Sequence, residues 1–165
     1  MAEISGYAVQ WRQPAVIAGL FQENFARGAF NQSLLDHPDV VALWAHDPSR
    51  PLARVSNKSL TIRSDSIGLW YSFKPDDKSP LGQEALASVG SGLVNEVSVG
   101  FSSIEEEWDD RGQIPKRTIT RAWLGEISIV LWGAYGQSTS AELVGRSTAA
   151  SKAEAAMRRR GISTT

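Results

Sequence analysis

The sequence predicts an α+β protein that is mainly β: an antiparallel β-barrel, or else a sandwich, with a few peripheral helices. Short runs of branched and aromatic residues, separated by turn residues, recur along the chain, whereas apolar residues at helical spacing occur in only a few places. The chain has 165 residues and no cysteine, so it is long enough to bury a core without disulfides. We therefore expect one domain followed by a tail.

The expected strands follow one another closely through the middle of the chain. In chain order they are 4–11, 40–46, 59–65, 67–73, 95–102, 116–124 and 125–132. Hairpin connections are indicated at 64–68 and at 109–112, where Ser, Asp and Gly cluster between two such runs. Hairpins join antiparallel neighbours, so the centre is predicted to be an antiparallel meander.

Two helices are expected beside the strands. Asn24 could cap a helix over 25–37, in which Phe25 and Phe30 are spaced for one face. Pro80 suits the first turn of a second helix over 80–89, and the glycines that follow would end it.

A change in composition marks the end of the predicted domain. From about Val144 the residues are small and polar, with a basic cluster at 158–160. We expect a folded domain over 1–143 and a mobile tail over 144–165.

Charge and composition argue against several classes of function. The 17 basic and 18 acidic residues leave a formal net charge of −1, so no global field attracts nucleic acid or an anionic membrane. No apolar run approaches the length of a bilayer span, and the N-terminus lacks the order of a secretion signal. With two histidines, no cysteine and no His-Glu-x-x-His spacing, we also expect no metal and no cofactor. The predicted location is cytosolic.

Three polar residues lie within or beside predicted strands. Ser98 alternates with Val97 and Val99 and so points away from their apolar face, although a lone serine there is most often simply solvated. His46 ends the strand 40–46, on the same side as Ala42, and precedes a turn, where it can face a cleft, bond Asp47 or bond the backbone.

The third of these residues is Glu126. It begins an apolar strand and needs a partner, which Arg117, Arg121 or His46 could provide. A serine nucleophile requires a base and a group that orients the base, and these residue types could supply both.

An ordered set of motifs then points to a family. GYA, FARGAF, LWAHD followed by LAR, VSVGF and LGEISIV occur in this order between about residues 5 and 140. The set resembles the prohead maturation proteases of tailed phages, serine peptidases similar in fold to the herpesvirus assemblins. The resemblance implies that Ser98 is the nucleophile, His46 the general base and Glu126 the group that orients His46. The rival nucleophiles Ser102, Ser103 and Ser128 remain, although they match no catalytic position of the motifs.

The resemblance also implies a biological role. Such an enzyme would act in the host cytoplasm, inside the immature procapsid, where it would cut the scaffold or the scaffold-like arm of the major capsid protein, and itself. A homo-oligomer is compatible with this role.

The oxyanion donors would be backbone amides or one of Arg117 and Arg121. Gly100 would allow close approach of the substrate backbone or mark a bulge.

Two alternatives from other classes remain open at this point. One is a non-catalytic capsid-assembly or scaffold module with the same barrel. The other is a peptide- or carbohydrate-binding β-domain that would use some of the six tryptophans as a platform.

Overall fold

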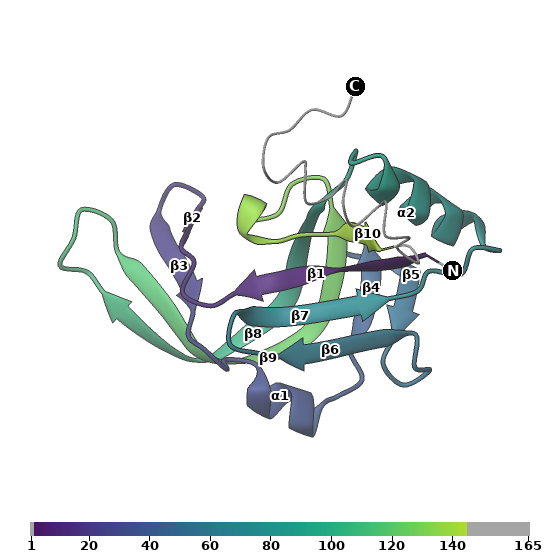
Figure 1. The fold of residues 1–165 in the computed structure, drawn as a ribbon. Helices are drawn as coiled ribbons and strands as arrows, with labels where there is room; N and C mark the ends of the chain where they lie inside the picture. Colours follow the sequence, from purple (N-terminus) through teal and green to yellow (C-terminus); the bar gives the residue numbers. More distant parts are fainter. Residues whose placement is uncertain (1, 145–165) are drawn as a thin grey trace.

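The computed structural model describes residues 2–144, which are mainly β with two α-helices (Figure 1). The strands are β1 (Glu3–Gln10), β2 (Ala15–Ile17), β3 (Phe21–Phe25), β4 (Val41–Trp44), β5 (Asp47–Arg54), β6 (Leu60–Ser64), β7 (Gly68–Phe73), β8 (Glu96–Asp109), β9 (Lys116–Val130) and β10 (Glu142–Val144). The helices are α1 (Asn31–Asp36), α2 (Pro80–Gly90) and the short 3-10 helix η1 (Gly136–Ser138). The predicted mainly β class is confirmed. The predicted tail, apart from Val144, lies outside the described residues.

The strands form two sheets. One has the order β10-β1-β7-β6 and is antiparallel throughout. The other has the order β2-β3-β9-β4-β5, with β8 paired to β9. In this second sheet β3 and β4 both run parallel to β9, so the prediction of a purely antiparallel meander is wrong there. Strand β9 is long enough to pair with β3 near its beginning and with β4 near its end.

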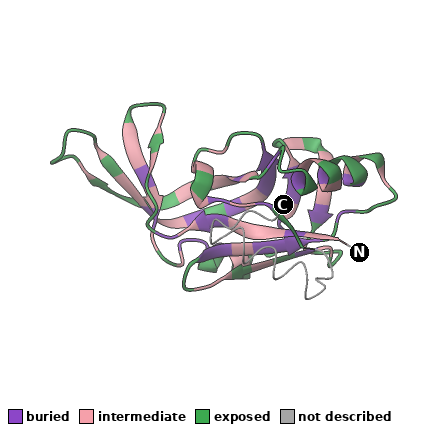
Figure 2. Ribbon diagram, turned by 45° about the horizontal axis from the view of Figure 1, so that its top comes forward, coloured by how far each residue is buried: buried purple, intermediate pink, exposed green. Residues whose placement is uncertain are grey.

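The apolar core lies between the two sheets. Among its largest fully buried side chains are Tyr71 and Phe25, and Figure 2 shows buried residues gathered in the central strands. The alternation predicted for β8 is confirmed, since Val97 and Val99 are buried and Ser98 is only half-buried. A bulge after Gly100 then turns Phe101 toward the ring of Phe25, at a centroid distance of 4.9 Å.

The first predicted helix is shorter than expected. Asn24 does not cap it but lies in β3, where its side-chain amide donates to Thr118 Oγ1 at 3.1 Å. Gly28 has a φ of +77°, which interrupts regular structure before α1 begins at Asn31. The second helix agrees with the prediction: Pro80 occupies the first turn, and Ser79 Oγ accepts from the Gly82 N–H at 2.9 Å.

The two strands expected over 116–124 and 125–132 are a single strand, β9. Together with β8 it forms a long hairpin, which Figure 1 shows projecting from the body beside the β2–β3 hairpin. The strands β2, β3, β5 and β10 were not predicted, and in β5 the residues Pro48 and Pro51 obscure the strand pattern.

Candidate active site

The imidazole of His46 is presented by a tight turn between β4 and β5. Trp44 pairs with Asp47, so Ala45 and His46 form a two-residue hairpin loop. Their φ values are +53° and +59°, which fits a type I′ turn. Residues other than glycine occupy this region at a cost of about 1 kcal/mol or more, so the turn depends on contacts that hold it.

Strand β9 supplies those contacts. The Ala45 N–H donates to the carbonyl oxygen of Ile129 at 2.9 Å, and the His46 N–H donates to Ser128 Oγ at 3.1 Å. The backbone of the turn is therefore anchored to the neighbouring strand at both of its central residues.

A third contact fixes the imidazole ring. His46 Nδ1 lies 2.5 Å from Glu126 Oε1, and the side chains of His46 and Glu126 are 45% and 16% exposed. A carboxylate bonded at Nδ1 favours the tautomer that carries its proton there, which leaves Nε2 free to accept a proton. Asp47, the other acid that the sequence placed beside His46, instead accepts from the backbone and hydroxyl of Ser49.

Ser128 connects the two halves of this arrangement. It is fully buried, and its hydroxyl donates to Glu126 Oε2 at 2.5 Å while it accepts from the His46 backbone. Both carboxylate oxygens of Glu126 are therefore bonded, one to the ring of His46 and one to Ser128. Sequence reasoning treated Ser128 only as a rival nucleophile, although its spacing of two from Glu126 already placed both on one face of the strand.

Ser98 lies on the same face of the sheet, on the next strand. In the β8–β9 register Ser98 is directly opposite Ser128, and Gly100 is opposite Glu126. Directly opposed residues of an antiparallel pair point to the same side, and a diagonal pair such as Ser98 and Glu126 is about 7–8 Å apart. One hydrogen-bonded imidazole can span such a gap. Among the hydrogen bonds of residues 2–144, His46 is joined to Glu126 and Ser128 but not to Ser98.

Gly100 leaves room for the carboxylate. A Cβ atom at this position would overlap Oε1 and Cγ of Glu126. The structure therefore gives the glycine a packing reason, in addition to the bulge that follows it.

Arg117 and Arg121 lie elsewhere. Arg117 binds the buried Glu23 at 2.9 Å and also pairs with Glu106, while Arg121 pairs with Glu105 at 2.6 Å. Along β9, Arg117 is about 36 Å from Ser128 and Arg121 about 23 Å, at about 3.3 Å per residue. The structure thus places both guanidinium groups toward the projecting hairpin rather than beside Ser98.

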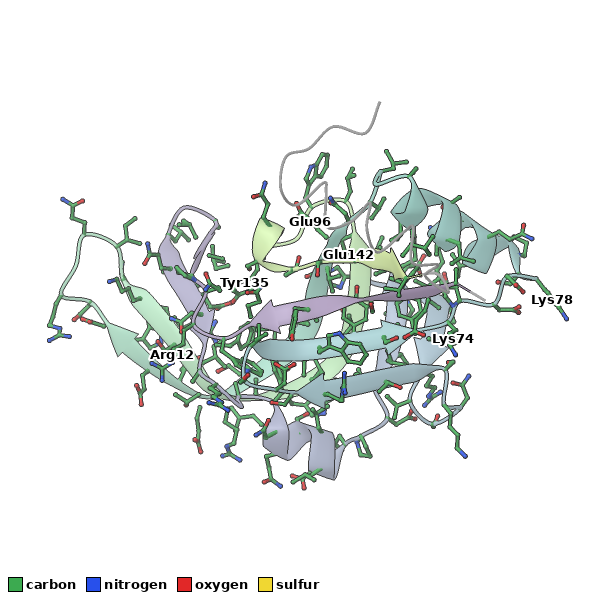
Figure 3. The ribbon with its side chains drawn as sticks, viewed as in Figure 1. Arg12, Lys74, Lys78, Glu96, Tyr135 and Glu142 are labelled. Carbon is green, nitrogen blue, oxygen red and sulfur yellow. The ribbon has the colours of Figure 1, made fainter. Side chains whose placement is uncertain are left out.

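Glu23 joins the projecting hairpin to the rest of the protein, because it binds both Arg117 and Tyr135. The hydroxyl of Tyr135, labelled in Figure 3, donates to Glu23 at 2.6 Å, and burial together with this contact raises the pKa of Tyr135 well above its usual range. Hydrogen bonds from the Trp108 indole, from Ser103 and from Arg117 lower the pKa of Glu106 to about 2. The charges of Glu23, Glu106 and Arg117 are therefore paired with one another within the fold.

Comparison with known proteins identifies the family. The sequence matches the caudovirus prohead serine protease family over residues 1–154. The chain belongs to this family. It is therefore a phage serine protease of capsid maturation, as the motifs predicted. No curated protein matches its sequence. The arrangement of His46 and Glu126 beside a strand serine suits this protease class.

Residues 2–144 contain no group of three or more His, Cys, Asp or Glu side chains that could bind a metal ion. In the same part of the chain, neither helix has the length and apolarity needed to cross a membrane.

Proposed function

We propose that the chain is a serine endopeptidase with Ser98 as nucleophile, His46 as general base and Glu126 as the group that orients His46. The observation that supports this assignment most directly is the bond between His46 and Glu126 on the sheet face that also presents Ser98. Hydrogen bonds between nucleophile and base are often long before substrate binds, so the geometry is compatible with a resting enzyme.

The proposed reaction begins when the Ser98 hydroxyl attacks a peptide carbonyl and His46 Nε2 takes its proton. Glu126 stabilises the imidazolium that forms. His46 then returns the proton to the leaving amine, and a water molecule hydrolyses the acyl-enzyme by the same route. Since Arg117 and Arg121 are paired on the hairpin, backbone N–H groups are the proposed oxyanion donors.

The proposed substrates follow from the family. They are the scaffold protein or the scaffold-like arm of the major capsid protein, and the protease itself, inside the procapsid in the host cytoplasm. Confinement in a shell raises the local concentration of an extended peptide, which compensates for weak binding. Closure of the two sheets into a herpesvirus-protease-like barrel stays a prediction of the sequence resemblance.

The test is to incubate the purified full chain, alone and with its phage's capsid protein, and to follow intact masses over time. Discrete fragments should appear with the wild type and with Ser102→Ala, an exposed serine of the same strand, and should vanish with Ser98→Ala. Fragments that persist with a folded Ser98→Ala variant would refute the assignment of the nucleophile. Intact masses in all samples would favour a non-catalytic assembly module.

A further inference from the structure

A hollow of about 790 Å³ opens beside the candidate active site. Its walls come from β4, from β5 and from the segment of β9 that contains Glu126. Binding sites for organic groups commonly have volumes of about 300–1,000 Å³, so the hollow is large enough for bulky side chains.

Part of the lining of the hollow is an apolar wall. It is formed mainly by Val41, Leu43, Pro51, Leu52 and Trp123. Trp123 is 41% exposed, and its ring lies against Gly125, where a Cβ atom would overlap it. An exposed apolar wall of this kind is typical of a binding site.

Polar residues line other parts of the same hollow. Lys74, labelled in Figure 3 at the end of β7, and Asp76 are both exposed. Arg54 is held by Asp39 at 2.6 Å, so its charge has a partner within the protein. The apolar wall is therefore the part of the hollow with the clearest ligand preference.

The hollow is continuous with the catalytic groups. Glu126 and Gly100 line it, and Gly100 is two residues beyond Ser98 on β8. An extended peptide advances about 3.3 Å per residue, so a substrate with its carbonyl at Ser98 brings neighbouring side chains to the hollow within one or two residues.

We propose that this hollow is the specificity subsite of the protease and receives a large aliphatic or aromatic side chain within two residues of the scissile bond. This inference rests on the proposed function. A pocket of this type discriminates a bulky apolar side chain from glycine by about 10- to 100-fold in kcat/KM.

The first experiment measures cleavage preference. The full chain is incubated with a peptide library, and the fragment ends are sequenced by mass spectrometry. Leu, Ile, Val, Met, Phe or Trp should be enriched at one position within two residues of the cut. A peptide pair with Leu or Gly at that position should then differ about 10- to 100-fold in kcat/KM.

Two variants and a control connect the preference to the hollow. Trp123→Ala and Pro51→Glu should reduce the Leu-to-Gly ratio below about threefold, mainly through KM. Trp108→Ala removes an indole that is 52% exposed on the projecting hairpin and should leave the ratio unchanged. Cleavage without an apolar preference, or a preference that survives in both subsite variants, would overturn the subsite and leave the proposed function intact.

A binding measurement separates the two ideas in the other direction. In the Ser98→Ala chain, N-acetyl-leucine amide should shift the NMR signal of the Trp123 indole but not that of Trp108, and N-acetyl-glycine amide should shift neither. Binding without any cleavage by the wild type would refute the proposed function and retain the apolar site. An unmoved Trp123 signal would overturn the subsite.

Discussion

Replacing Ser128 by alanine tests whether this hydroxyl positions His46 and Glu126, the proposed catalytic groups. The substitution removes the donor to Glu126 Oε2 and the acceptor for the His46 N–H. Since Ser128 is fully buried, water does not replace these bonds without rearrangement. His46 then loses the acceptor of its backbone N–H, and Glu126 loses the donor to one of its carboxylate oxygens.

The size of the effect follows from the two bonds. A hydrogen bond to a charged group contributes about 1.5–3 kcal/mol, and an unsatisfied buried N–H costs about 1–3 kcal/mol. Because the site can relax, we expect the free energy of unfolding to fall by about 2–4 kcal/mol. If about half of this loss appears as misplacement of His46, kcat/KM falls roughly 5- to 30-fold, mainly through kcat.

The assay combines urea unfolding, followed by tryptophan fluorescence, with cleavage of a peptide identified by the library experiment. Ser103→Ala is the matched control, because the Ser103 hydroxyl also donates to a carboxylate, that of Glu106, at 2.8 Å in an exposed setting. It should change the unfolding free energy by less than about 0.5 kcal/mol. Equal effects of the two substitutions, or a Ser128→Ala enzyme with wild-type kcat, would refute the reasoning.

Further predictions concern the same site and the protein's titration. Gly100→Ala should displace the Glu126 carboxylate and lower kcat by at least about 100-fold while the fold is kept; normal activity would show that the carboxylate tolerates a Cβ. Ala45→Asn should raise the stability by about 1 kcal/mol, or ~3 °C in Tm, because asparagine tolerates a positive φ; a lower Tm would contradict the strain assigned to the turn. Burial raises the pKa of all three tyrosines above the unfolded value of about 10, so their neutral forms stabilise the folded state below that pH and the contribution is lost as the pH rises further. Tyrosinate absorbance should therefore appear together with unfolding in alkali, and a normal titration of the folded chain near pH 10 would contradict this. The three residues are Tyr7, Tyr71 and Tyr135.

The alternation around Ser98 was sufficient to place this residue. Val97 and Val99 are buried as predicted, and a period of two fixes the opposite face for Ser98. The sequence also showed that Glu126 needs a partner, but it left three candidates. The structure selects His46, because the pairing of β4 with β9 sets its turn beside Glu126. Sequence spacing does not contain such a pairing.

The position of His46 was predicted for a reason that the structure does not support. The sequence argument extended a strand through residue 46 and gave His46 the side of Ala42, which is in fact buried in the core. The strand ends at Trp44, and the turn moves His46 to the face of Ser128. Because Ala45 and His46 lack the Asn-Gly signal of a type I′ turn, local sequence does not reveal it.

The β8–β9 register leaves the proposed triad with one contact still to be made, between Ser98 and His46. Glu126 and Ser128 are fixed within β9, and they hold the His46 turn from one side, while Ser98 is fixed in β8 on the other. Elements held by strands position side chains more accurately than free loops do. The imidazole remains 45% exposed, so under the proposed assignment a peptide laid across it would displace water and favour the formation of a hydrogen bond from Ser98. Substrate binding, rather than a rearrangement of the fold, would then complete the proposed triad.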